Sequence, residues 1–243
     1  MDTTHVTITA DDFSAGVPNL DFSEYTQLVN VNIKSNRVFD MADLKLPSSV
    51  LVLLIEAQPL IPGPVPPFVR ELSLVSREDY PEHFKDVDVL HLPDTIELLN
   101  LGGFHLVSAD YKLPPNITEL EFWGMVFCHE NLPSSLKVLK VYAWRIHIGN
   151  LPKTLEILKA NAYKGHVQIG HLDYPKSLKT IDLTGNRVNA MCIFTYSLPN
   201  LEHVCINTMH AKNMIHGPSI QGGESYVYWN RNFTSPDQKE VVV

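Results

Sequence analysis

Aliphatic residues recur along most of the chain with one fixed spacing. A first aliphatic is followed three positions later by a second and two positions after that by a third, and nine segments have this spacing, beginning at Leu28, Val50, Val69, Ile96, Ile117, Leu136, Leu155, Leu178 and Leu201. Successive starts lie 22, 19, 27, 21, 19, 19, 23 and 23 residues apart. Helical repeats need about 33 residues or more, whereas about 20 to 29 residues suffice for a repeat built around one strand. The spacing therefore predicts a solenoid of about nine repeats over residues 28–210.

The second and third aliphatics of each segment are separated by one residue, as in a short strand. Side chains along a strand point alternately to opposite faces, so Leu53 and Ile55, for example, are expected to point inward. One such unit has nothing to pack against, but successive units can stack their strands in parallel and share a continuous core. We therefore expect one parallel β-sheet with the aliphatics on its inner face.

A proline precedes most of the aliphatic segments, usually in the pattern Leu-Pro-x-Ser/Thr, as in residues 46–49 and 132–135. Proline fixes its own φ angle and favours an extended conformation in the residue before it. Because a unit of 19 residues also leaves little room for a helix, we predict extended return segments with short 3₁₀ turns and little α-helix. A β-sandwich or propeller is the alternative, but the Asn-Gly and Asp-Gly hairpin turns common in such folds do not occur in the sequence.

The repeated pattern LPxSLxxLxL resembles the short leucine-rich repeats of some bacterial effector proteins and of FNIP-like arrays. The resemblance covers residues 28 to about 210 and implies a curved array with its parallel sheet on the concave face. It also implies an asparagine that satisfies backbone groups at the turn after the strand. Two units carry this residue, as Asn36 and Asn186, whereas others replace it, for instance with Arg145 and Lys164.

The ends of the chain lack the repeat, as expected for the ends of a solenoid. We expect residues 1–27, which are rich in acidic residues, to form an amino-terminal cap over the first core layer. Residues 211–243 are expected to form a carboxyl-terminal cap, with Tyr226–Trp229 as a capping strand, and a flexible tail from Ser235. The longest step between repeats carries residues 77–88, which form a candidate secondary contact loop.

Charge and hydropathy narrow the choice of partners. The net charge is −8 and no run of Lys or Arg is longer than two residues, whereas binding to a nucleic-acid backbone needs clustered cations. No apolar stretch reaches the roughly 18 residues of a membrane span, and the first residues lack the features of a secretory signal. We therefore expect no nucleic-acid partner, no membrane partner and a cytoplasmic location.

Residues with catalytic or metal-binding potential are scattered. None of Cys128, Cys192 and Cys205 forms a Cys-x-x-Cys pair, and no phosphate-binding, metalloprotease or serine-hydrolase motif is present. Glu119 and Glu121 are a possible acid–base pair, but nothing in the sequence indicates the enclosed pocket that would shift their pKa values. We therefore predict no enzymatic activity, no cofactor and no metal site.

The strand positions between the inward aliphatics are expected to form a binding surface. On three adjacent predicted strands these positions combine two aromatic residues with charged and apolar ones, which is typical of protein-binding hot spots. We therefore predict a partner-binding patch made of Glu119, Glu121, Trp123, Val138, Lys140, Tyr142, Ile157 and Lys159. Two other interpretations stay open: Glu121 and Lys140 can form an ion pair of little value, and Trp123 can pack over the edge of its strand.

The resulting functional hypothesis is a non-enzymatic scaffold that holds a protein or peptide on the concave face of the sheet. A substrate-recognition subunit of a multi-chain enzyme, such as a ubiquitin ligase, is an alternative, and a structural array without a specific ligand is another. The sequence does not predict the oligomeric state.

Overall fold

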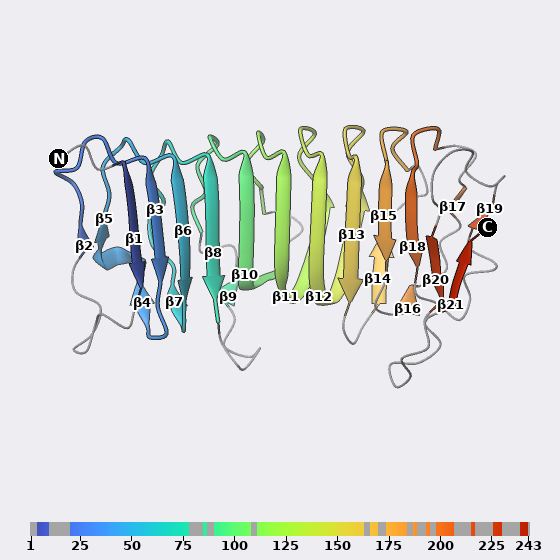
Figure 1. The fold of residues 1–243 in the computed structure, drawn as a ribbon, viewed down its shortest axis with the longest axis horizontal. Helices are drawn as coiled ribbons and strands as arrows, with labels where there is room; N and C mark the ends of the chain where they lie inside the picture. Colours follow the sequence, from blue (N-terminus) through green and yellow to red (C-terminus); the bar gives the residue numbers. More distant parts are fainter. Residues whose placement is uncertain are drawn as a thin grey trace. The chain divides into compact units, whose positions relative to one another are not determined.

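The structure is a computed structural model of residues 1–243 (Figure 1). It describes residues 4–9, 20–77, 85–86, 90–107, 111–162, 166–169, 174–183, 187–188, 193–194, 198–206, 215–216, 226–229 and 239–242. The chain forms two compact units, the first made of Met1–Leu106 with Tyr111–Met125 and the second of Val107–Asp110 with Val126–Val243.

The first unit is built on a parallel sheet whose strands lie side by side in the order of the sequence (Figure 1). Its strands are β1 (His5–Thr9), β3 (Asn30–Lys34), β6 (Val52–Ala57), β8 (Glu71–Ser76), β10 (Leu98–Leu106) and the first part of β11 (Glu119–Asn131). Equivalent repeat positions are paired, since Leu53 lies opposite both Val31 and Leu72. The sheet therefore has the register that the aliphatic spacing predicts.

Burial follows the alternation along each strand. The inward apolar residues on the strands of the first unit are at most 2 % exposed, namely Val31, Ile33, Leu53, Ile55, Leu72, Leu74, Leu99, Leu101, Leu120 and Phe122. The residues between them keep part of their surface exposed. Each repeat thus adds one apolar layer to a continuous core, and burial of those side chains is the main stabilising term.

Short extended segments form the side of the first unit opposite the sheet. They are β2 (Leu20–Asp21) paired with β5 (Leu44–Lys45), β4 (Phe39–Asp40) paired with β7 (Leu60–Ile61), and β9 (Lys85–Asp86) paired with the end of β10. The 3₁₀ helix η2 (Met41–Asp43) lies among them, with the Asp40 carboxylate accepting from the Ala42 amide at its start. β10 leaves the sheet for this layer at Gly103, whose φ of +77° favours glycine.

The second unit has the same construction. β12 (Val138–Asn150), β13 (Ile157–Ala162), β15 (Thr180–Leu183) and β18 (His203–Ile206) form its parallel sheet. β14 (His166–Ile169) pairs with the end of β12 and with β16 (Arg187–Val188). Two small sheets complete the described part, β17 (Ile193–Phe194) with β19 (Ile215–His216), and β20 (Tyr226–Trp229) with β21 (Lys239–Val242), the latter pair antiparallel.

The predicted fold class is confirmed, because both units are parallel-sheet β-solenoids and η2 is the one helix among the described residues. No helix in this part of the chain is long and apolar enough to cross a membrane. Three strands are longer than predicted, because they continue past the Leu-x-Leu segment. The total lengths of β10, β11 and β12 are 9, 13 and 13 residues.

The terminal regions also contain strands of their own. β1 lies within residues 1–27 and adds a further strand to the sheet beside β3, with Val6 opposite Val31. Tyr226–Trp229 forms the strand β20, whose partner β21 lies within the segment from Ser235. The roles of these segments as a cap and a flexible tail stay predictions. The greater part of the 77–88 insertion lies outside the described residues.

In the repeat that contains Asn36, the role expected of the turn asparagine belongs to Ser35. Asn36 is exposed, whereas its neighbour Ser35 is buried and binds Arg37 through its side chain, accepting from the Arg37 amide at 3.1 Å and donating to the Arg37 carbonyl at 3.1 Å. A short side chain reaches these backbone groups without leaving the buried turn. Asn186 and Lys164 lie outside the described residues.

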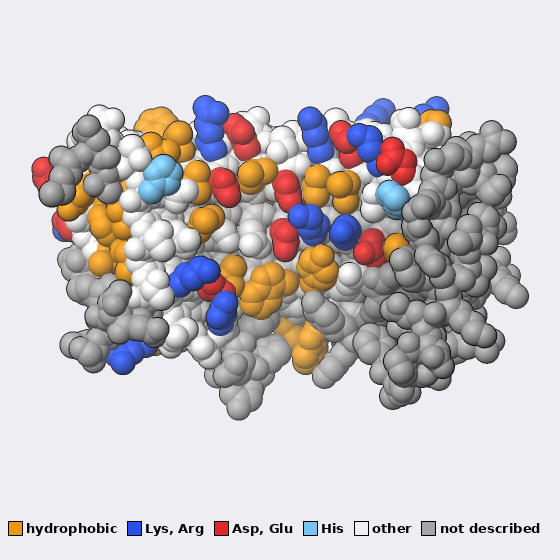
Figure 2. Space-filling model, in the orientation of Figure 1, with side chains coloured by type: hydrophobic (Ala, Val, Ile, Leu, Met, Phe, Trp, Pro, Cys, Tyr) orange, Lys and Arg blue, Asp and Glu red, His pale blue; other side chains and the backbone are white. Residues whose placement is uncertain are grey.

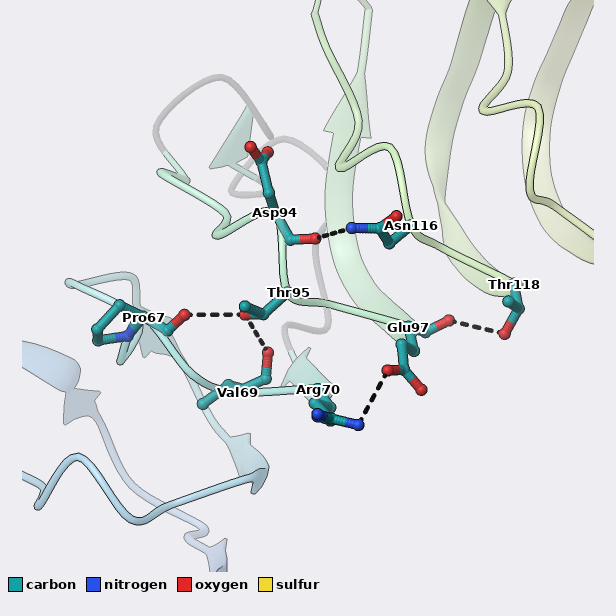
Figure 3. A network of polar contacts seen from close by, with 8 residues as sticks. All are labelled: Pro67, Val69, Arg70, Asp94, Thr95, Glu97, Asn116 and Thr118. Atoms are coloured by element: carbon teal, nitrogen blue, oxygen red, sulfur yellow. Dashed lines mark hydrogen bonds and ion pairs between the residues drawn. The ribbon is translucent and has the colours of Figure 1, made fainter.

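Successive repeats are joined by hydrogen bonds at the turns that precede the strands. In the Pro-x-Ser/Thr-aliphatic turn, the proline carbonyl accepts from the aliphatic amide, as Pro93 does from Ile96 at 3.3 Å. The Ser or Thr hydroxyl then reaches back to the preceding repeat: Thr95 Oγ1 lies 2.9 Å from the Pro67 carbonyl oxygen and 2.8 Å from that of Val69 (Figure 3). Equivalent bonds are made by Ser49, Thr154 and Ser177, and Asn116 and Asn200 use their amide groups in the same place. We call this series the turn ladder.

Candidate protein-binding face

The residues of the predicted patch all lie on strands and keep part of their side chains exposed. Glu119, Glu121 and Trp123 belong to β11 within the first unit, and the other five lie on β12 and β13 in the second unit, namely Val138, Lys140, Tyr142, Ile157 and Lys159. Each is half-buried, and the residues that alternate with them are buried. Their predicted outward orientation therefore agrees with the burial pattern, while their joint role in binding stays a prediction.

Within the second unit, the predicted neighbours are brought together by the register of the sheet. Val138 lies opposite Ile157, and Lys140 lies opposite Lys159. Lys159 in turn lies opposite Asp182 on β15. This face thus combines an apolar row with a charged row that contains cations on two neighbouring strands and a carboxylate on the third.

Cys205 continues the charged row on β18, opposite Asp182. Burial raises the pKa of the Cys205 thiol, the negative charge of Asp182 raises it further, and Lys159 partly opposes the change. The thiol is therefore held in its protonated form, which is a poor nucleophile and a poor metal ligand. Among the described residues, no group of three His, Cys, Asp or Glu side chains is placed to hold a metal ion.

Trp123 packs against the neighbouring strand within the first unit. Its indole ring covers Gly102 on β10, so closely that a Cβ atom at position 102 would overlap the ring. Contact of an aromatic ring with a glycine on an adjacent strand stabilises the pair of strands. Trp123 therefore has a packing role, and loss of binding after its replacement would not by itself identify a contact residue.

The outward face of the first unit contains a hollow of about 350 Å³ over β8 and β10. It is lined by Leu54, Glu71, Leu72, Ser73, Leu98, Leu99, Asn100, Glu119 and Glu121. Figure 2 shows this face, with acidic side chains near its middle. Since Glu119 and Glu121 are two of the three carboxylates that line it, the hollow includes part of the predicted patch. The contributions of β6, β8 and β10 were not predicted.

A row of charges, also not predicted, lies at the start of the strands. Arg70 pairs with Glu97 at 3.3 Å in the first unit (Figure 3), and Lys179 pairs with Glu156 at 2.6 Å in the second. The hydrogen bond and charge of Lys179 lower the pKa of Glu156, and Glu156 raises that of Lys179. These residues all follow the first aliphatic of a repeat, so a comparison of that position between repeats would have found them.

Exposed apolar side chains also lie near these strand starts, and the repeat pattern did not predict them. Phe68 is 54 % exposed, and Leu51 and Leu98 are each 37 % exposed. Phe68 occupies the position of the turn ladder that carries Ser, Thr or Asn in neighbouring repeats, so it cannot donate the ladder hydrogen bond. A residue that lacks the hydrogen bond of its neighbours and exposes an apolar side chain is a candidate for a binding role.

Comparison with known proteins finds similarity in structure. No protein-family model matches the sequence, and no curated protein matches it. The structure is similar to that of YopM from Yersinia enterocolitica WA-314, with a TM-score of 0.42 and 21 % sequence identity over 83 % of this chain and 51 % of that one. The chain thus spans about half the length of YopM. The repeated apolar residues inside a parallel sheet, to which each repeat adds one strand, make this a solenoid repeat protein.

Proposed function

We propose that the protein is a non-enzymatic scaffold that binds a protein or peptide through the outward face of its parallel sheet. The observation that carries this proposal is the composition of that face. In the first unit, Leu54 and Leu98 are accessible beside carboxylates, and in the second, Val138 and Ile157 form an apolar row beside Lys140 and Lys159. Apolar side chains surrounded by charged ones provide both burial energy and specificity on binding.

Strands inside the sheet, such as β6 and β8, are paired on both edges, so their outward face offers side chains and not backbone groups for recognition. Strands presented in register place them about 4.8 Å apart from one strand to the next, which suits an extended segment or a helix of a partner. The net charge of −8 favours a partner with a basic surface and disfavours nucleic acid and anionic membranes. The free thiols of Cys128 and Cys205 fit a reducing compartment, and we place the protein in the cytoplasm.

Site-specific photo-cross-linking in a lysate of the source cell tests this proposal. p-Benzoylphenylalanine replaces Leu98 in the first unit or Tyr142 in the second, and it replaces Val38, which is 53 % exposed outside the strands of the sheet, as the matched control. The proposal expects a reproducible cross-linked protein from Leu98, Tyr142 or both, and not from Val38. The same products from all three positions, or none from any, would contradict it. Ubiquitin-ligase components among the specific products would favour a substrate-recognition subunit.

A further inference from the structure

The hollow of the first unit has walls of two chemical kinds. Glu71 on β8 and Glu119 and Glu121 on β11 contribute carboxylates, Leu54 and Leu98 contribute apolar surface, and neither lysine nor arginine lines it. Glu71 lies directly opposite Leu98 in the register of the sheet, so a carboxylate and an apolar side chain are neighbours on adjacent strands. Among the described residues, Glu71 has no ion-pair partner.

The floor of the hollow contains a polar pair with unused hydrogen-bonding capacity. The Asn100 side-chain amide donates to Ser73 Oγ at 3.1 Å, and the Asn100 Oδ1 atom is buried without a hydrogen-bond partner in the described part of the chain. A buried acceptor without a partner is unfavourable. A donor that entered the hollow could satisfy this oxygen after a small rotation of the amide.

We propose that this hollow holds a basic side chain, of arginine or lysine, from an extended segment of the partner. The long aliphatic stem of such a side chain packs against Leu54 and Leu98, its charged end lies between the carboxylates, and its N–H groups are donors for Asn100. A neutral or acidic side chain lacks either the charge or the donors. The inference rests on the proposed function, since it names the chemistry of the segment that the first unit binds.

The test is a titration of the full-length protein followed by NMR. The probe is the tripeptide acetyl-Leu-Arg-Leu-amide, and the matched probe replaces arginine with citrulline, which keeps the shape and removes the charge. The methyl signals of Leu54 and Leu98 and the side-chain amide of Asn100 report on the hollow. The Glu71→Gln variant removes one carboxylate from its wall, and Glu24→Gln removes one exposed carboxylate elsewhere in the same unit.

The proposal expects the arginine peptide to shift the signals of the hollow and the citrulline peptide to bind about threefold to tenfold more weakly. It also expects Glu71→Gln to weaken binding of the arginine peptide about twofold to fivefold and Glu24→Gln to leave it unchanged. Three results would overturn it: no shifts up to about 10 mM peptide, equal binding of the two peptides, or equal effects of the two variants.

The NMR titration and the cross-linking together distinguish a wrong side chain in the hollow from a wrong function of the protein. If the peptides do not bind in the hollow while cross-linking at Leu98 or Tyr142 identifies a specific partner, the scaffold proposal stands and the basic side chain is wrong. If the arginine peptide binds as expected but no partner is cross-linked at either position, the hollow is a cation-binding site and the scaffold proposal is contradicted.

Discussion

Thr95 offers a direct test of whether the turn ladder stabilises the solenoid. Its hydroxyl lies between the carbonyl oxygens of Pro67 and Val69, at 2.9 and 2.8 Å (Figure 3). Thr95→Val keeps the branched shape of the side chain and removes the donor, so the two carbonyl groups lose this partner. One net hydrogen bond is worth about 0.5–1.5 kcal/mol, and an unsatisfied buried group costs about 1–3 kcal/mol. We expect the first unit to lose about 1–3 kcal/mol of stability.

The assay is urea unfolding followed by tryptophan fluorescence. The chain has three tryptophans, and Trp123 is the one in the first unit, so replacing Trp144 and Trp229 with phenylalanine makes the fluorescence specific to that unit. With a denaturant slope of about 2 kcal/mol per M, the expected loss lowers the unfolding midpoint by about 0.5–1.5 M urea in Thr95→Val.

Two control variants separate the hydrogen bond from other effects of the substitution. Thr95→Ser keeps the donor and loses one half-buried methyl group, which should cost about 0.5 kcal/mol. Thr118→Val removes a hydroxyl that donates at 3.1 Å to the Glu97 carbonyl, and that carbonyl also accepts from the amides of residues 118 and 119, so the loss should be under about 1 kcal/mol. If Thr95→Val unfolds within about 0.5 kcal/mol of Thr95→Ser, the stabilising role of the ladder is refuted.

Three further predictions follow from particular contacts. Phe68→Thr supplies the missing ladder donor and should raise the urea midpoint by the equivalent of about 0.5–1 kcal/mol; an unchanged or lower midpoint would contradict the equivalence of this position with Thr95. Gly102→Ala should displace the Trp123 indole, shifting its emission to longer wavelength and costing about 1–3 kcal/mol, and an unchanged spectrum would argue against the contact. Hydrogen bonds from Ser23 and Lys45 lower the pKa of Asp21 to about 2. Because the unfolded value is higher, at about 3.9, this contribution to stability is complete above that pH and is lost as the pH falls toward 2. NMR titration of the Asp21 carboxyl checks the value, and a midpoint near 4 would show that these hydrogen bonds do not persist in solution.

Local spacing was enough to predict the sheet. The identity of the inward residues depends on a period of two along each strand, and their stacking depends on a repeat of the same spacing in the next unit. Both are properties of the linear sequence, so Leu53, Leu72 and Leu99 could be predicted to share one core, and their paired positions confirm it. The extended return segments were predictable for a similar reason, because the frequent prolines and short units exclude long helices there.

The partners of individual polar and small residues depended on the tertiary structure. The Ser or Thr of the Leu-Pro-x-Ser/Thr pattern was visible in the sequence, but its acceptors lie in the preceding repeat, between 18 and 28 residues away for the bonds observed. The same holds for Gly102, which accommodates Trp123, and for the hollow, whose walls come from several strands. The sequence by itself therefore determined which side chains face inward and which face outward. The repeat register also predicted that outward positions such as Val138 and Ile157 lie opposite each other. Only the stacking of the repeats decided the ladder bonds, the contact of Trp123 with Gly102 and the hollow, because these depend on side-chain conformations and on the unequal lengths of the connecting segments.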